Sequence, residues 1–282
     1  MTRTRTLRTT GHSSSSYKAN RLPEMERLSV DGVCFENTDT ATALAAVHAL
    51  VEDAIGGTPR VVFFVNVHTL HVARKSRELR ESLDRADVLL PDGSGIAFAG
   101  RFHGNPVREN LNGTDFIPRV LADAERSARS VYLLGARPEV IQAGRRRLEV
   151  LYPGLRICGS RHGHFLEGEE KEIVEEIAHA RPDILLVGMG TPFQEVWITR
   201  NLHRFHAGTC FGVGGLFDFL SGEKPRASVW IRRMGLEWVF RFVHEPLAKW
   251  ERVLFEIPLF ALRTITGRVS VHKALPRARN GA

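Results

Sequence analysis

The sequence PDILLVGMGTPFQEVW, Pro182–Trp197, combines an apolar run, a glycine-containing turn and a helix start. Its apolar run, Ile184–Val187, is bounded by turn residues, as in a strand that is buried on both faces of a parallel sheet. Thr191 is a favourable N-cap and Pro192 suits the first helical position, so we expect a helix to begin there. A buried strand therefore leads through a short turn into a helix.

The turn between this strand and helix is a candidate phosphate site. A helix start offers unpaired N–H groups and the positive end of the helix dipole, and parallel sheets bind ligands at the carboxyl ends of their strands. Gly188, Gly190 and Thr191 would approach the ligand there. Glycines at this spacing suit a tight turn without a ligand equally well. Gln194 and Glu195 favour the ligand site because they add polar groups in the first helical turn.

Buried strands alternate with helices from about residue 40 to residue 220. This order is typical of a doubly wound, mostly parallel, Rossmann-like α/β sheet with helices on both faces. We expect further strands at Arg60–Asn66, Val88–Leu90, Val131–Leu134, Leu155–Gly159 and Thr209–Val213. We expect helices at Ala41–Ala54, Thr69–Arg85, Ser94–Phe102, Thr114–Ala128, Pro138–Val150 and Glu169–Ala180, with Thr114 as a cap.

Polar and glycine-containing turns follow several of these strands, so they would gather at one edge of the sheet. Asp92 lies in the turn Pro91-Asp92-Gly93. An aspartate there is often a turn former, but its place at the ligand-binding edge makes it the best candidate for a general base. Asn66 ends the neighbouring strand and could hydrogen-bond a sugar hydroxyl. Gly135 begins another strand-to-helix turn at the same edge.

Two more carboxylates lie close to glycine turns. Asp115 could contact a ligand, although capping its own helix is the favoured interpretation. Asp218 follows the turn Gly212–Gly215, where Gly214 is another predicted ligand contact. The sequence has no Asp-x-Asp pair, so no metal site is predicted. The charge of a departing diphosphate would then be balanced by arginines and helix N-termini.

The net charge of +7 is unevenly distributed. Residues 1–25 have a net charge of +4, residues 26–222 of −4 and residues 223–282 of +7. Basic ends attract nucleic acid or an anionic membrane surface, although most charge runs are simply solvated. The three cysteines have no metal or redox spacing, which indicates structural thiols in a reducing cytosol. No window approaches the roughly 20 apolar residues that span a bilayer, so any membrane contact would be peripheral.

The composition changes again near residue 223. Trp230, Trp238 and Trp250 are interleaved with the basic residues Arg226, Arg232, Arg233, Arg241, Lys249, Arg252 and Arg263. Such interleaving is typical of an interfacial helix on an anionic membrane, and a helical hairpin packed on the sheet is the alternative. We therefore expect four segments: a disordered basic tail (1–27), an α/β catalytic domain (28–222), a basic aromatic membrane-associating appendage (223–268) and a flexible tail (269–282).

Several motifs in one order resemble the WecG/TagA/CpsF glycosyltransferases, glycosyltransferase family 26. They are Pro91–Gly93, Gly113–Asp115, Val131–Gly135, His162–Phe165, Gly190–Trp197, Gly212–Asp218, Arg226-Ala227, Gly235–Trp238 and Glu245-Pro246. The resemblance covers roughly residues 28–262. It implies inverting, metal-independent transfer of a sugar from a UDP-sugar to a polyprenyl-diphosphate-linked saccharide, with no cofactor. It also implies a peripheral location on the cytoplasmic face of the plasma membrane, in the synthesis of wall polymers, capsule or exopolysaccharide.

The resemblance also implies roles for individual residues. Asp92 matches the family's proposed base and Asn66 its site asparagine, and Gln194 and Asp218 match a further site glutamine and aspartate. Arg241 matches an arginine of the basic appendage that closes over the active site and touches the membrane. Lys249 and Arg252 match less closely, and together with Arg232 and Arg233 they would face the membrane or the lipid diphosphate.

Phe64 and Asn110 depart from the family pattern at positions near the sugar, so the resemblance does not fix the donor sugar. Two other functions are weighed against this one. A nucleotide-binding oxidoreductase would need a Gly-x-Gly-x-x-Gly turn, but Phe193 stands where the third glycine would be. A non-enzymatic binder of anionic polymers would use the basic ends, but no nucleic-acid motif is present and no nucleic acid partner is expected. The sequence leaves open whether the protein forms a homo-oligomer.

Overall fold

The computed structural model describes residues 22–54, 57–228, 230–231, 234, 236–244 and 246–275, without the side chains of Glu167, Arg241, Ala248 and Lys249. Its centre is a six-stranded parallel sheet with the strand order β4-β3-β8-β7-β5-β6. The strands are β3 (Arg60–Val65), β4 (Val88–Pro91), β5 (Ser130–Gly135), β6 (Arg156–Arg161), β7 (Ile184–Gly188) and β8 (Thr209–Gly212). The predicted doubly wound α/β sheet is confirmed.

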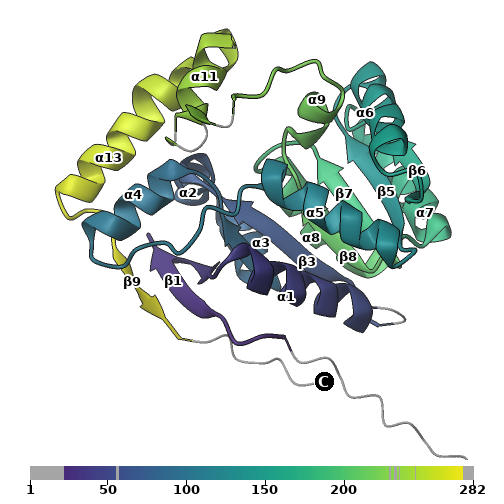
Figure 1. Cartoon of the computed structure of the whole chain (residues 1–282), viewed down its shortest axis with the longest axis horizontal. Coiled ribbons are helices and arrows are strands. Elements are labelled where there is room, and N and C mark those ends of the chain that lie inside the picture. Colours follow the sequence, from purple (N-terminus) through teal and green to yellow (C-terminus); the bar gives the residue numbers. More distant parts are fainter. Residues whose placement is uncertain are drawn as a thin grey trace, which may run out of the picture.

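Helices cover both faces of this sheet (Figure 1). They are α1 (Thr40–Asp53), α2 (Val67–Ala73), α3 (Arg77–Arg85), α4 (Ser94–Phe102), α5 (Gly113–Arg126), α6 (Pro138–Leu151), α7 (Glu170–Ala180), α8 (Phe193–Asn201) and α9 (Leu216–Leu220). Alternate strand residues point to opposite faces, so Phe63 packs in a core with α2, α3, α4, α7 and α8. Its neighbour Phe64 packs in a second core with α1, α5, α6 and α9.

Two helix predictions need correction. The single helix expected at Thr69–Arg85 is two helices, because Ser76 accepts a hydrogen bond from the Leu79 N–H at 3.2 Å and caps α3. Thr114 does not cap α5, since Asn112 takes that role and accepts from the Asp115 N–H at 3.0 Å. In both cases a polar side chain one helical turn before the apolar face decides where the helix begins.

A second, three-stranded antiparallel sheet was not predicted. It consists of β2 (Val33–Asn37), β1 (Glu26–Val30) and β9 (Val271–Ala274), in that order. The expected boundaries of both tails are therefore wrong: residues 26–27 lie in β1, and residues 271–274 pair with it as β9. Residues 1–21 and 276–282 lie outside the part that the structure describes.

The C-terminal appendage is helical, as expected. It includes α11 (Glu237–His244), α12 (Pro246–Glu251), the π-helical segment η3 (Arg252–Glu256) and α13 (Ile257–Ile265). The last helix packs against α4 and α2, so the appendage lies beside the carboxyl edge of the sheet (Figure 1). None of the helices in the described ranges combines the length and apolar character that a bilayer crossing requires.

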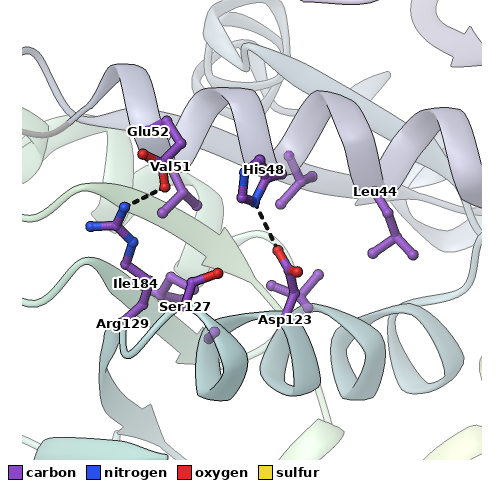
Figure 2. A pocket seen from close by; sticks show the side chains of 11 residues that line it. Leu44, His48, Val51, Glu52, Asp123, Ser127, Arg129 and Ile184 are labelled. Carbon is purple, nitrogen blue, oxygen red and sulfur yellow. Dashed lines mark hydrogen bonds and ion pairs between the residues drawn. The ribbon is translucent and has the colours of Figure 1, made fainter. Parts of the chain in front are cut away.

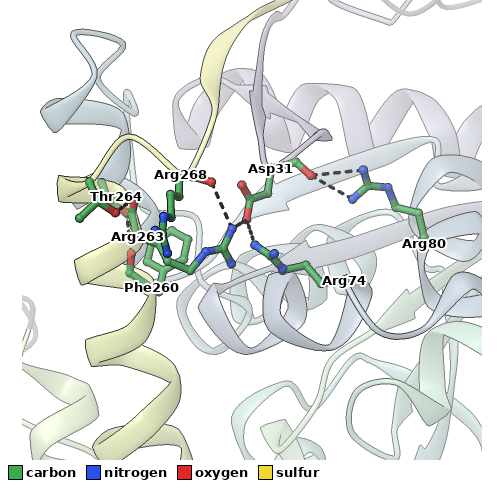
Figure 3. A network of polar contacts seen from close by, with 8 residues as sticks. Asp31, Arg74, Arg80, Phe260, Arg263, Thr264 and Arg268 are labelled. Atoms are coloured by element: carbon green, nitrogen blue, oxygen red, sulfur yellow. Dashed lines mark hydrogen bonds and ion pairs between the residues drawn. The ribbon is translucent and has the colours of Figure 1, made fainter.

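One carboxylate joins the appendage to the rest of the protein (Figure 3). Asp31 lies in the two-residue turn between β1 and β2, and its side chain is 11% exposed. Its Oδ2 lies 3.1 Å from Nη1 of Arg74, the C-cap residue of α2, and 3.3 Å from Nη2 of Arg263 in α13. Its carbonyl oxygen accepts from both Nη atoms of Arg80 at 3.2 Å. Three arginines from distant parts of the chain therefore converge on one residue.

We predict that Asp31→Asn lowers the free energy of unfolding by about 2 kcal/mol, because the largely buried guanidinium group of Arg263 and the more exposed one of Arg74 lose their counter-charge. Asparagine tolerates the positive φ of this turn, so the backbone is preserved. Urea denaturation measures the loss, and faster amide exchange in β9 and α13 locates it. Glu81→Gln is the matched control: it breaks the exposed Arg77–Glu81 pair and should cost less than about 0.5 kcal/mol. Equal effects would contradict an anchoring role for Asp31.

Candidate active site

A large cleft lies between the carboxyl edge of the parallel sheet and the appendage. Its volume is about 730 Å³, which suits a nucleotide sugar or a similar ligand. Its sheet side includes Asn66, Asp92, Thr191 and Asp218, and its appendage side includes Trp238, Arg252, Glu256 and Phe260. The catalytic domain and the appendage thus form one cleft together.

Asn66 and Asp92 are neighbours because β3 and β4 are paired in register. Val65 lies opposite Pro91, so the residues that follow leave the sheet side by side, and the Asp92 N–H donates to the Val65 carbonyl at 2.7 Å. Asn66 caps α2 by accepting from the Thr69 N–H at 3.1 Å. Its Nδ2 then donates to Oδ2 of Asp92 at 3.4 Å. Strand register and a helix cap therefore orient this carboxylate in the cleft.

The two residues that depart from the family pattern both line the cleft beside Asp92. Asn110 accepts a hydrogen bond from the Gly93 N–H at 2.6 Å and so holds the turn that carries Asp92. Gly93 has a φ of 102°, which other residues rarely adopt. Phe64 packs edge-on against Phe116 with ring centroids 6.1 Å apart. Asn110 thus supports the turn, and Phe64 makes an apolar patch on the cleft wall.

Gln194 lines the cleft, as predicted for a site residue, and connects the two glycine turns at its floor. Its side chain is buried, and its Oε1 accepts from the Gly214 N–H at 2.9 Å and the Gly190 N–H at 3.3 Å. Both glycines line the cleft and have positive φ angles. Their N–H groups point at Gln194, and a contact of these two glycines with a ligand stays a prediction. Gln194 fixes the ends of β7 and β8 relative to each other.

Glu195 was predicted to contact the ligand, but it is fully buried and does not line the cleft. Its Oε1 accepts from Nε2 of Gln194 at 2.8 Å and from Oγ1 of Thr191 at 2.9 Å. Burial raises the pKa of Glu195, and these two hydrogen bonds oppose the rise. Thr191 therefore donates to Glu195 instead of capping the helix, and α8 begins at Phe193 with Pro192 as its N-cap.

Gly135 and Gly188 serve close packing at the sheet edge instead of lining the cleft. A Cβ atom on Gly135 would lie 2.4 Å from the Gly188 carbonyl oxygen, and one on Gly188 would lie 2.7 Å from the Gly214 carbonyl oxygen. Such distances are shorter than any real Cβ contact. These two glycines let the ends of β5, β7 and β8 approach one another, which shapes the floor beneath the ligand.

Ion pairs hold the segment that enters the appendage across the edge of the sheet. Nζ of Lys224 lies 2.7 Å from Oδ2 of Asp218, and Nη2 of Arg226 lies 2.7 Å from Oδ1 of Asp115. Of these four, Asp218 and Lys224 line the cleft. Asp115 instead lies in the first turn of α5, where it also accepts from the Asn112 side chain. Both predicted carboxylates are thus paired with bases of the appendage.

Sequence reasoning missed the contact that closes the cleft. Nδ1 of His68, in the first turn of α2, lies 2.8 Å from Oε2 of Glu256 in the appendage. Both residues line the cleft. The sequence feature that could have indicated this contact is the position of His68, two residues after Asn66 in the first turn of the same helix. Arg252 lines the cleft as well, whereas Arg232, Arg233 and the side chains of Arg241 and Lys249 lie outside the described part of the chain.

A second hollow, between α1 and α5, is no competitor for this site (Figure 2). Its volume of about 20 Å³ holds about one water molecule. The polar groups that line it are paired: Nδ1 of His48 lies 2.9 Å from Oδ2 of Asp123, and Arg129 pairs with Glu52. No group of three His, Cys, Asp or Glu residues within the described ranges is arranged to hold a metal ion.

Comparison with known proteins identifies a glycosyltransferase family and two similar bacterial proteins. The sequence model of the family described as "Glycosyl transferase WecG/TagA/CpsF family" matches residues 28–274. An N-acetylglucosaminyldiphosphoundecaprenol N-acetyl-beta-D-mannosaminyltransferase from Bacillus subtilis (strain 168) is 31% identical over 205 residues, covering 73% of this chain and 78% of that protein. A protein of the same name from Staphylococcus aureus (strain NCTC 8325 / PS 47) is 28% identical over 252 residues, covering 88% and 96%.

We predict that Gln194→Leu lowers the free energy of unfolding by about 1–3 kcal/mol, because the Gly190 and Gly214 N–H groups lose their acceptor. Urea denaturation measures the change. Gln142→Leu, at an exposed position in α6, is the matched control and should stay within about 0.5 kcal/mol of the parent protein. A Gln194→Leu protein as stable as the control would show that the glutamine does not fix the two turns.

Proposed function

The chain belongs to the WecG/TagA/CpsF family of glycosyltransferases, and from this premise we propose that it transfers a sugar from a UDP-sugar to a polyprenyl-diphosphate-linked saccharide during the synthesis of a cell-surface polysaccharide. The relatives from Bacillus subtilis and Staphylococcus aureus support this acceptor, since their names specify N-acetylglucosaminyldiphosphoundecaprenol. The observation that carries the proposal is the Asn66–Asp92 pair, held at adjacent strand ends inside a cleft of about 730 Å³.

Asp92 is the proposed general base. It accepts the proton of the acceptor hydroxyl as that oxygen attacks the anomeric carbon of the donor sugar. The new glycosidic bond forms on the face opposite the leaving group, the bond to the diphosphate breaks, and UDP departs, so the configuration inverts. Asn66 donates to one carboxylate oxygen of Asp92 through its Nδ2 and so orients the carboxylate that receives the proton. In this mechanism one carboxylate suffices, because the diphosphate is a good leaving group.

The diphosphate of UDP is proposed to lie on the appendage side of the cleft. The Gly190 and Gly214 N–H groups are bonded to Gln194, so cationic side chains have to balance its charge. Lys224 lines the cleft and is the candidate among the described residues, with Arg241 as the family resemblance implies. Asp218 holds Lys224 in place at 2.7 Å. Transfer is therefore proposed to need no metal ion.

The appendage is also proposed to dock on the cytoplasmic face of the plasma membrane. Leu254, Phe255, Leu259, Leu262 and Ile265 form an outer apolar face on η3 and α13, and each is between 46% and 61% exposed. The two charged residues of the segment 254–265 are turned towards the catalytic domain: Glu256 pairs with His68, and Arg263 pairs with Asp31. A half-exposed helical face without charge is suited to the interface between lipid head groups and acyl chains.

Neither alternative function gains support from the structure. Phe193 is exposed at the start of α8, where an oxidoreductase of this fold would need the third glycine of its nucleotide turn. The basic residues Lys224, Arg226 and Arg263 are paired with carboxylates of the catalytic domain. They therefore do not form a surface for an anionic polymer.

We expect Asp92→Asn to lower kcat by about 10²–10⁴-fold, because the acceptor hydroxyl loses its base. UDP affinity should hardly change, since the amide retains the size and the hydrogen-bonding oxygen of the carboxylate. Release of UDP in the presence of a lipid-linked acceptor reports kcat, and calorimetric titration reports the affinity. Asp84→Asn, at an exposed position of α3, is the matched control and should keep full activity. Full activity of Asp92→Asn would remove Asp92 from the mechanism.

Vesicle flotation tests the docking face. Combining Leu259→Glu with Leu262→Glu should weaken binding to vesicles that contain phosphatidylglycerol by about a hundredfold, since each leucine loses its apolar burial. The loss should be similar at low and high salt, because the outer apolar face carries no charge. The control combines Val150→Glu with Leu166→Glu, two apolar residues elsewhere that are more exposed than Leu259 and Leu262. Equal losses in both proteins, or none in either, would count against docking through α13. Deleting residues 224–282 is a poorer test, because it removes β9 as well as the appendage.

A further inference from the structure

The large cleft has two chemically different walls. At the strand ends it is polar, with Asn66, Asp92 and Asn110. Opposite them the lining is apolar and comes from two helices that pack on each other: Phe98 from α4, and Ile257, Phe260 and Ala261 from α13. The nucleobase of a nucleotide sugar can cover only part of this wall, because its sugars and phosphates are polar. The apolar wall therefore matches some other part of the substrates.

Phe98 differs from an ordinary core residue. Phe260, on the facing helix, is 7% exposed, whereas Phe98 is 42% exposed although it lines the cleft. Phe102 follows one helical turn later, is 50% exposed, and has its ring centroid 6.1 Å from that of Phe98. The two rings form an uncovered apolar track that starts at the cleft and runs outward along α4.

The track runs beside α13 and its outer apolar face. Because α4 packs against α13, the track lies next to the helix that carries the outer apolar face proposed above to dock on the membrane. The two charged residues of the segment 254–265 are paired with the catalytic domain, Glu256 with His68 and Arg263 with Asp31. The route thus joins the reacting groups to the place where a lipid bilayer would lie.

We propose that the polyprenyl chain of the acceptor leaves the cleft over Phe98 and Phe102, along the seam between α4 and α13. This inference rests on the proposed function, which supplies an acceptor with a polar head and a long isoprenoid tail. The head would place its hydroxyl at Asp92, its diphosphate would lie near Arg252, and its first isoprene units would cover the two rings. Phe98 and Phe102 would then select for a lipid-linked acceptor over a free saccharide.

Farnesyl diphosphate, a short water-soluble polyprenyl diphosphate, tests the path without any donor sugar. Its dissociation constant is compared with that of inorganic diphosphate by calorimetry, with UDP present at saturation so that the nucleotide site is filled. The intact protein should bind farnesyl diphosphate at least about tenfold more tightly, since part of the tail is buried. Phe98→Ser combined with Phe102→Ser should remove that preference and leave the affinity for inorganic diphosphate unchanged.

The control is Leu259→Ser combined with Leu262→Ser, which alters the outer apolar face but not the cleft, and should retain the preference. Equal binding of the two probes by the intact protein would overturn the proposed path. So would a preference that survives in the Phe98→Ser, Phe102→Ser protein, or one that the control variant also loses. The UDP titration that precedes the experiment is a separate check: no binding of UDP would contradict the proposed function, and the lipid path with it.

Discussion

The register between β3 and β4 is the constraint on which the site depends. Val65 lies opposite Pro91, so the next residue of each strand, Asn66 or Asp92, leaves the sheet beside the other. Asn66 also begins α2, and that helix carries His68 towards Glu256 in the appendage. A shift of one residue in this register would separate the amide from the carboxylate and turn the side chains of β4 to the opposite faces of the sheet. One pair of strands thus positions both the proposed base, Asp92, and the contact between α2 and the appendage.

Several basic side chains of the appendage point towards the catalytic domain and not towards solvent. Lys224, Arg226 and Arg263 are paired with Asp218, Asp115 and Asp31 of the catalytic domain. These pairs neutralise basic residues that the net charge of the segment alone would suggest for a binding surface. The exposed side of η3 and α13 is instead apolar. The basic composition of the C-terminal segment therefore helps to attach the appendage to its own domain. The proposed docking on lipid would use the outer apolar face instead.

The sequence was sufficient for the parallel sheet because its strands are uninterrupted apolar runs between turn residues, and Asp92 and Asn66 were found because both follow such runs. The antiparallel sheet was missed for two reasons. The Asp31-Gly32 turn is a strong hairpin signal that was overlooked, whereas the pairing of β1 with β9 joins segments too distant for any local pattern. The burial of Glu195 could not be predicted either, since one helical turn carries both it and exposed Phe193. Burial there depends on which face packs on the sheet.

The pairing of β1 with β9 has a consequence for the order of events on the ribosome. Val30 pairs with Val271, so β1 is translated long before its second partner exists. Until β9 arrives, one side of β1 is an open edge that could recruit a strand from another chain. The nascent chain can complete its parallel sheet during this interval, but the strand that follows the helices of the appendage is added only afterwards. The small antiparallel sheet is thereby completed only after the parallel sheet can have formed.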